Sequence, residues 1–156
     1  MTSKWLRRTM VLAACASAAL LTACGSSTVD SAVTPTRIVS FGDALSDVGY
    51  AGKRYTINDG STNIWAQQFA ASYGRTLETS SAGGAGYARG NARLALTPDA
   101  AGVAGTLTVT QQIDAFLAAG SIGSNDMVLI NSGISDIITQ MAAAKALGAD
   151  RVELYT

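Results

Sequence analysis

The stretch that decides the fold is Phe41-Gly42-Asp43-Ala44-Leu45-Ser46-Asp47-Val48-Gly49. An apolar run from Ile38 to Phe41 leads into it and predicts a short buried strand. A Gly-Asp pair then ends the run, so residue 44 lies just past the carboxyl end of that strand. Ligands bind at this end of the strands in open α/β sheets. We therefore expect a ligand cleft beside this stretch.

The remaining sequence alternates helix and strand patterns. The predicted elements are a strand at 37–41, a helix at 63–73, a helix at 110–120, a strand at 127–130 and a helix at 134–147. The continuous apolar run at 127–130 suits a central parallel strand. Residues 48–61 are expected to form a loop that lines the cleft. This order predicts an α/β layered fold with a parallel sheet.

The first predicted helix carries clear boundary signals. Asn63 is expected to cap it and Gly74 to end it. Trp65, Phe69 and Tyr73 recur at every fourth position, which places them on one face. We expect this aromatic face to pack in the core.

The composition bounds the class of protein. The chain has 156 residues, of which 48% are hydrophobic, and it has no formal net charge. These values fit one globular domain, and the balanced charge gives no basic patch for nucleic acid. The sequence contains no histidine, which removes the usual general base near neutral pH and the commonest metal ligand. We expect no metal and no cofactor.

The amino-terminal residues have the pattern of an export signal. Three basic residues precede an apolar segment at 10–21, which is too short to span a bilayer. Leu21-Thr22-Ala23-Cys24 then resembles the bacterial lipobox. The resemblance implies a lipoprotein signal peptide at 1–23, acylation of Cys24 as the membrane anchor, and a flexible tether at 24–36. An ordinary secretory signal that is cleaved near Ala23 is the alternative.

The residue after the lipobox bears on localisation. Gly25 stands there in place of aspartate. In Gram-negative lipoproteins this pattern resembles the one that is sorted to the outer membrane. The expected localisation is therefore the cell envelope, by a lipid anchor.

The opening stretch resembles the signature of the GDSL (SGNH) hydrolases, a family of esterases and lipases. Eight of its nine positions, Gly42 among them, suit the typical Phe-Gly-Asp-Ser-Leu-Ser-Asp-x-Gly. The ninth is Ala44, where the family has its nucleophilic serine. Alanine has no hydroxyl, so no acyl-enzyme can form at this position. Ser46 is expected to be structural, and Asp43 and Asp47 to hydrogen-bond the backbone of the turn.

A second block resembles the family pattern Asn-Tyr-Ala-x-Gly-Gly-Ala-Arg. It is Gly86-Tyr87-Ala88-Arg89-Gly90-Asn91-Ala92-Arg93. The resemblance implies an oxyanion-hole backbone donor at Asn91, the position of the family's second glycine, or at Gly90 just before it. The alternative is a glycine-rich turn that binds no ligand.

A third block follows the strand at 127–130 and resembles the family's Gly-x-Asn-Asp. It is Gly133-Ile134-Ser135-Asp136, with Ser135 in the place of the asparagine that donates to the oxyanion. Ser135 could instead cap the following helix. The family's last block, Asp-x-x-His, is absent from a chain without histidine. Three of the family's catalytic features are therefore changed or missing.

The resemblance implies a flavodoxin-like three-layer sandwich, of which residues 37–156 would form the amino-terminal part. It also implies a carboxylic-ester hydrolase by family, truncated and inactive as written, with an ester or lipid-like molecule in the cleft. The alternative is a non-catalytic surface lipoprotein that binds lipid or glycan there. An unrelated envelope lipoprotein with a chance motif is the remaining interpretation.

Overall fold

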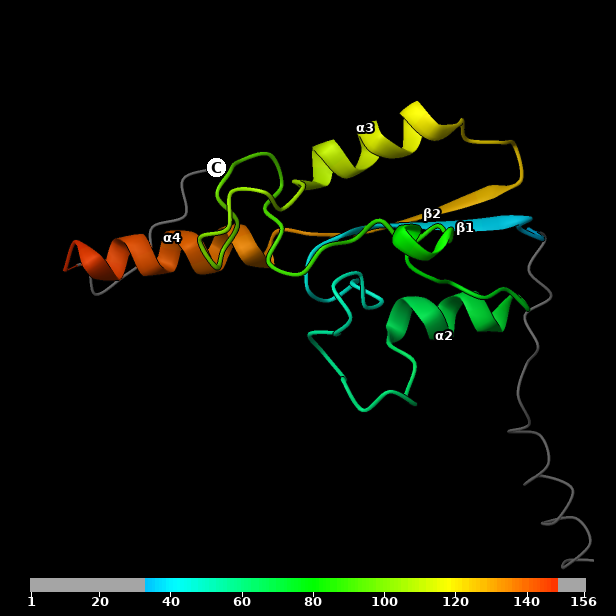
Figure 1. Ribbon diagram of the computed structural model, residues 1–156, viewed down its shortest axis with the longest axis horizontal. Helices are drawn as coiled ribbons and strands as arrows, with labels where there is room; N and C mark the ends of the chain where they lie inside the picture. Colours follow the sequence, from blue (N-terminus) through cyan, green and yellow to red (C-terminus); the bar gives the residue numbers. More distant parts are fainter. Residues whose placement is uncertain (1–32, 149–156) are drawn as a thin grey trace, which may run out of the picture. The chain divides into compact units, whose positions relative to one another are not determined.

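The computed structural model describes residues 33–148. Its elements, labelled as in Figure 1, are β1 (Arg37–Gly42), α2 (Trp65–Ser72), the short 3-10 helix η2 (Ser80–Ala82), α3 (Val109–Ala119), β2 (Asp126–Asn131) and α4 (Ile134–Ala146). Each predicted strand and helix is present, and the chain has an α/β fold. The predicted signal peptide at 1–23, the tether as far as residue 32 with Cys24, and residues 149–156 lie outside the described residues.

The sheet is parallel, as predicted. Strands β1 and β2 pair in register from Arg37 opposite Asp126 to Gly42 opposite Asn131, so their carboxyl ends lie at the same edge. On the other side of β1, Ser40 N–H donates to the carbonyl of Ala85 at 3.0 Å, and Tyr87 N–H donates to the carbonyl of Ser40 at 2.7 Å. The strand β1 therefore lies between β2 and the segment around residue 86.

The predicted central position of the second strand is wrong within residues 33–148. There β2 has a strand partner on one side only. Leu129 is buried, but the next residue, Ile130, is 58% exposed. The continuous apolar run identified a strand correctly and did not determine its place in the sheet.

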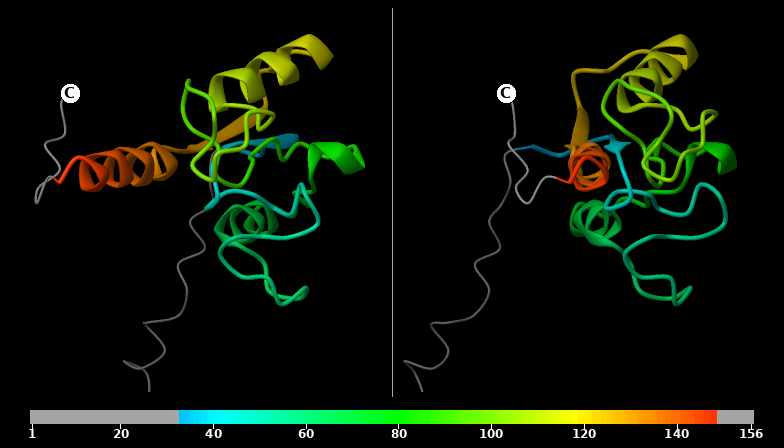
Figure 2. Two further views of the ribbon diagram at one scale, coloured as in Figure 1. Left: turned by 60° about the vertical axis from the view of Figure 1, so that its left-hand side comes forward. Right: turned by 90° about the vertical axis from the view of Figure 1, so that its left-hand side faces the viewer.

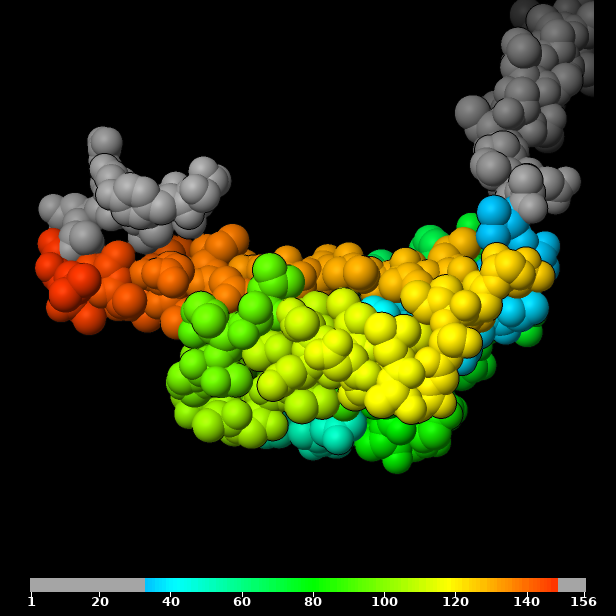
Figure 3. Space-filling view, turned by 90° about the horizontal axis from the view of Figure 1, so that it is seen from above, coloured from blue at the N-terminus to red at the C-terminus, as the bar shows by residue number. Residues whose placement is uncertain are grey.

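Helices α2 and α3 cover opposite faces of the sheet (Figures 1 and 2). Neighbouring residues of a strand point to opposite faces. Ile38 accordingly packs with Ala66 and Ala70 of α2, whereas Val39 packs with the α3 side chain of Phe116. In Figure 3, atoms of α3 and of the segment before it cover one face of the sheet, and α4 extends past that segment.

The boundaries of α2 differ from the prediction. The N-cap residue is Ile64, and its N–H donates to the Gln67 side-chain oxygen at 3.2 Å. Asn63 therefore precedes the cap and does not serve as one. The turn at Gly74, with φ of +66°, follows the helix as expected.

The aromatic face of α2 is only partly in the core. Phe69 and Tyr73 pack against it, whereas Trp65 is 38% exposed. The fully buried positions are Ala66 and Ala70, because the small methyl groups allow the helix to approach the sheet closely. The side of α2 that faces the core is therefore centred on Ala66 and Ala70, each of which directly follows an aromatic residue of the predicted face.

Helix α3 begins one residue before the predicted start at Thr110. Thr108 caps it: its hydroxyl accepts from Gln111 N–H at 3.2 Å, and the Gln111 side chain accepts from Thr108 N–H at 3.0 Å. This reciprocal pair satisfies two backbone donors at the start of the helix. Gly120 follows its last turn, as predicted.

Candidate functional site

The three motif blocks meet at the carboxyl edge of the parallel sheet. The first follows β1 and the third follows β2, so the parallel pairing brings both to one edge. The second continues from the segment beside β1. Its Arg89 N–H donates to the carbonyl of Gly42 at 3.1 Å. Residues more than 40 positions apart in the sequence are therefore neighbours, as a common cleft requires.

Asp43 connects the first block to the third. Its side chain is fully buried. One carboxylate oxygen accepts from Leu45 N–H at 3.2 Å, and the other accepts from Ile134 N–H at 3.1 Å. Gly133, the N-cap residue of α4, has no side chain that could cap the helix. Asp43, from a remote part of the sequence, instead accepts a hydrogen bond from a backbone donor of the first turn. The predicted backbone hydrogen bonding is confirmed.

Asp47 connects the first block to the second. Its Oδ1 accepts from Gly49 N–H and Tyr50 N–H, both at 2.8 Å, which confirms the predicted turn. Its Oδ2 accepts from Gly90 N–H at 2.7 Å. This last contact spans 43 residues and was not predicted from the sequence.

Asp136 connects the third block to the second. It forms an ion pair with Arg93, with Nε to Oδ1 at 3.2 Å. Its other oxygen accepts from Leu94 N–H at 2.7 Å. Arg93 is buried, whereas the Asp136 side chain is 28% exposed, so the pair is in partial contact with water. All three motif aspartates thus hold the blocks together.

The two predicted backbone donors of the second block differ in what they can do. The Gly90 N–H already donates to Asp47. Asn91 has a φ of +63°, and among residues 33–148 none accepts a hydrogen bond from its N–H. Of these two backbone donors, only that of Asn91 is unpaired within residues 33–148.

Ser135 does not cap α4. The helix begins at Ile134 after Gly133, which places Ser135 inside the first turn, and no side-chain cap bond forms. Ser135 is 2% exposed, and its carbonyl accepts from the Thr139 hydroxyl at 2.7 Å. Its role toward an oxyanion stays a prediction.

Ala44, where the family resemblance would place a nucleophile, lies in the turn that follows β1. Ser46 N–H donates to the carbonyl of Asp43 at 3.0 Å and closes this turn around Ala44. Ser46 itself is fully buried, and its hydroxyl has no partner within the described part of the chain. The Ser46 hydroxyl lies next to Gly42, at a place where the backbone is so tightly packed that a Cβ on Gly42 would overlap the carbonyl oxygen of Asn131. Ser46 therefore has no access to a substrate.

A residue that the sequence analysis missed holds the start of this turn. Gln112 of α3 is fully buried. Its side-chain oxygen accepts from Gly42 N–H at 2.9 Å, and its amide donates to the carbonyls of Gly42 at 3.0 Å and Leu107 at 3.2 Å. The sequence could have indicated a buried role for this polar residue, because Gln112 falls between Val109 and Phe116 on the apolar face of the helix.

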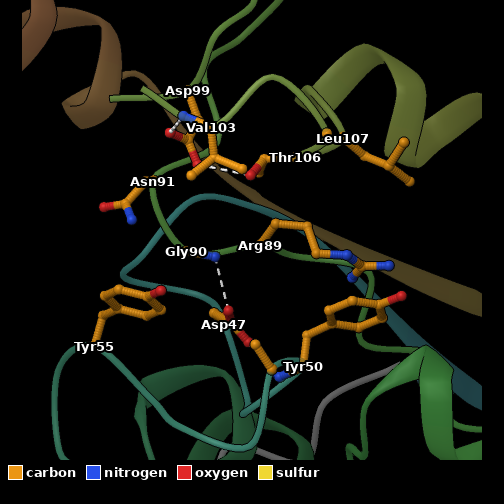
Figure 4. Close-up of a pocket in the computed structure, with 12 residues that line it drawn as sticks. Asp47, Tyr50, Tyr55, Arg89, Gly90, Asn91, Asp99, Val103, Thr106 and Leu107 are labelled. Carbon is orange, nitrogen blue, oxygen red and sulfur yellow. Dashed lines mark hydrogen bonds between the residues drawn. The ribbon is translucent and has the colours of Figure 1, made fainter. Parts of the chain in front are cut away.

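A cavity of about 440 Å³ opens beside the second block (Figure 4). It is formed by the loop after the first block, by Arg89 to Asn91, and by residues 99–107. Of the predicted site residues, Asp47, Gly90 and Asn91 line it. Ala44 and Ser135 are not among its lining residues.

Arg89 forms part of the cavity wall and supports Tyr50. Its guanidinium carbon lies 3.2 Å from the centre of the Tyr50 ring, which is a close cation–π contact. The same guanidinium donates to the backbone carbonyls of Tyr87 and Ala88 and to the hydroxyl of Ser80. Burial lowers the pKa of Arg89 from its ordinary value. An arginine still stays protonated at neutral pH, because its ordinary pKa is so high.

Comparison with protein-family models, curated proteins and solved structures found no match for this chain. Residues 33–148 contain no group of three or more His, Cys, Asp or Glu side chains that could hold a metal ion. In the same range no helix has both the length and the apolar character that crossing a membrane requires.

Proposed function

We propose that this chain is a lipid-anchored protein similar to GDSL-type hydrolases, and that its sequence does not support ester cleavage. The observation that carries the proposal is the joining of the three motif blocks by Asp43, Asp47 and Asp136 at one sheet edge. Each block resembles its family counterpart in sequence, and the contacts between blocks are the ones that a shared cleft needs. An ester or lipid-like small molecule is the proposed occupant.

The finer fold proposal is the flavodoxin-like SGNH sandwich. It is supported by the parallel pairing of β1 with β2 and by the positions of α2 and α3 on opposite faces. Residues 37–148 would correspond to the first part of that sandwich.

The chemistry of ester cleavage is missing at two points. Ala44 has no hydroxyl to attack a carbonyl carbon, and the chain has no histidine to accept the proton of a nucleophile. In addition, the Gly90 N–H is already used by Asp47. The proposed protein therefore keeps a binding cleft and lacks the reaction.

The test is a short-chain p-nitrophenyl ester assay together with labelling by a fluorophosphonate probe. We expect no turnover and no labelling of the purified chain. Ala44→Ser is also expected to stay unlabelled, because no histidine activates the new hydroxyl. Turnover or labelling of the unmodified chain would contradict the proposal.

The lipid anchor is proposed at Cys24, with the cell envelope, and the Gram-negative outer membrane in particular, as the localisation. Cys24→Ser should abolish membrane association of the chain in fractionated cells. If the variant still fractionates with the envelope, the anchor lies elsewhere.

A non-catalytic binding role is the second candidate function. The observation that favours it is the cavity itself, whose volume lies in the range of small-molecule sites. Its lining includes Tyr50 and Tyr55, which are 40% and 45% exposed. Large aromatic rings that stay accessible in a concave site are typical of binding surfaces.

A further inference from the structure

The two tyrosine rings in the cavity are held in place by contacts behind them. Tyr50 lies under the Arg89 guanidinium. The ring of Tyr55 lies so close to Gly90 that a Cβ at that position would overlap it. Figure 4 shows the two rings on either side of Asp47. Glycine at position 90 therefore gives space to an aromatic ring.

The charged groups of the cavity are already satisfied. Asp47 accepts three backbone hydrogen bonds. Asp99 accepts from Ala101 N–H and Val103 N–H, both at 2.8 Å, and from the Thr106 hydroxyl at 2.6 Å. The guanidinium of Arg89 is directed to backbone carbonyls and to a serine hydroxyl. One cation and two carboxylates line the cavity, so an anionic ligand has no free positive charge to bind.

The polar groups left for a ligand are neutral, and they lie beside the apolar side chains of Val103 and Leu107. Asn91 is one of the residues that line the cavity, and the two donors and one acceptor of its side-chain amide can pair with hydroxyl groups. The backbone N–H of the same residue has no acceptor among residues 33–148. An acyl chain in this space would remove the amide from water without replacing its hydrogen bonds, which is unfavourable. A ligand that carries hydroxyl groups around an apolar ring face suits both the amide and the tyrosines.

We infer that this cavity binds one ring of a neutral carbohydrate. The C–H face of the sugar packs against Tyr55, and its hydroxyl groups exchange hydrogen bonds with Asn91. The inference rests on the non-catalytic binding role proposed above, and it selects a glycan over a lipid as the occupant. It does not depend on ester chemistry at Ala44.

The test is an NMR titration of the purified, ¹⁵N-labelled chain. One series uses neutral hexoses and their disaccharides, and a parallel series uses short-chain fatty acyl esters. We expect the sugars to shift the backbone amides of Gly90 and Asn91 and the side-chain amide of Asn91. The esters should leave these signals in place.

Two variants and one control locate the site. Tyr55→Ala removes the ring, and Asn91→Gly removes the amide while it suits the positive φ. Each should weaken sugar binding by about tenfold or more. Trp65→Ala removes an exposed aromatic ring of α2 that does not line the cavity, and it should leave the affinity unchanged.

Each other outcome overturns the inference in a distinct way. If the esters shift the Gly90 and Asn91 signals and the sugars do not, the occupant is an acyl compound and the binding role stands. If neither series shifts them, both the sugar inference and the binding role fail. If sugars bind but Tyr55→Ala binds equally well, the sugar site lies elsewhere. A dispersed amide spectrum of each variant shows that it is folded.

Discussion

Substitution of Gln112 gives a direct test of how the turn after β1 is held, because the Gln112 side chain hydrogen-bonds to Gly42 at the start of this turn. The substitution Gln112→Met keeps nearly the same volume and removes the amide. The N–H of Gly42 then loses its acceptor in a fully buried site, because Gln112 is 0% exposed. A buried donor without a partner costs about 1–3 kcal/mol.

Two weaker losses add to this cost. The carbonyl of Gly42 keeps its hydrogen bond from Arg89 N–H, and the carbonyl of Leu107 is only partly buried. Each lost bond to these carbonyls is therefore worth roughly 0.5 kcal/mol. The expected loss in the free energy of unfolding is about 3 kcal/mol, a large fraction of the ~5–15 kcal/mol that is typical of domains.

The assay is equilibrium unfolding in urea, monitored by circular dichroism. With a slope of about 1–3 kcal/mol per molar urea, the midpoint should fall by roughly 1–3 M. The control is Gln140→Met on the exposed side of α4, which changes the same residue type without a buried contact and should stay within about 0.5 kcal/mol of the parent chain. Equal midpoints for the two variants would refute the bridging role of Gln112.

Three further perturbations probe other parts of the structure. Asp47→Asn should lower the free energy of unfolding by about 1–2 kcal/mol, because the new NH₂ group cannot accept the hydrogen bond from Gly90 N–H. Hydrogen exchange at the Gly90 amide should become faster, and unchanged exchange would count against this contact. The hydrogen bond from Arg37 lowers the pKa of Asp126, so its stabilising effect is present near neutral pH and is lost as the pH falls through that lowered pKa. The gap in melting temperature between the parent chain and Asp126→Asn should therefore close in acid, and a gap that does not depend on pH would contradict this. Ile64→Ala should cost about 2–5 kcal/mol, whereas Ile138→Ala, at a site that is 51% exposed, should cost under about 0.5 kcal/mol; similar urea midpoints would contradict the burial difference.

Much of the fold follows from local patterns in the sequence. The run before the motif and the run at 127–130 both form strands, and their parallel pairing follows from the helices between them. The boundaries of α2 and α3 were less predictable. Thr108 caps α3 with help from Gln111, while Asn63 does not cap α2, and both outcomes depend on where the chain enters each helix. A capping residue type alone does not determine the first turn.

The candidate site was predictable in position and less so in its contacts. Sequence spacing placed Asp43 and Asp47 in a backbone-bonded turn, and both are there. The contacts from Asp47 to Gly90 and from Gln112 to Gly42 span 43 and 70 residues. No local pattern contains information about such pairs, because they arise only when the sheet brings distant segments together. The loop at 48–61 was expected to line a cleft, and Tyr50, Ala51 and Tyr55 do line the cavity. The part of its wall formed by residues 99–107 was not predicted, for the same reason.

The contacts also explain how a motif can stay intact around an alanine. The turn is held by Asp43, by Asp47 and by Gln112, and none of these contacts uses a side chain at position 44. Substitution of a serine by alanine there would remove no hydrogen bond that supports the turn. Loss of Asp43 or Asp47 would instead leave partly buried backbone donors without acceptors. Under the proposed function, the motif residues thus divide into those that hold the turns together, which are present, and those that would carry out the reaction, which are not.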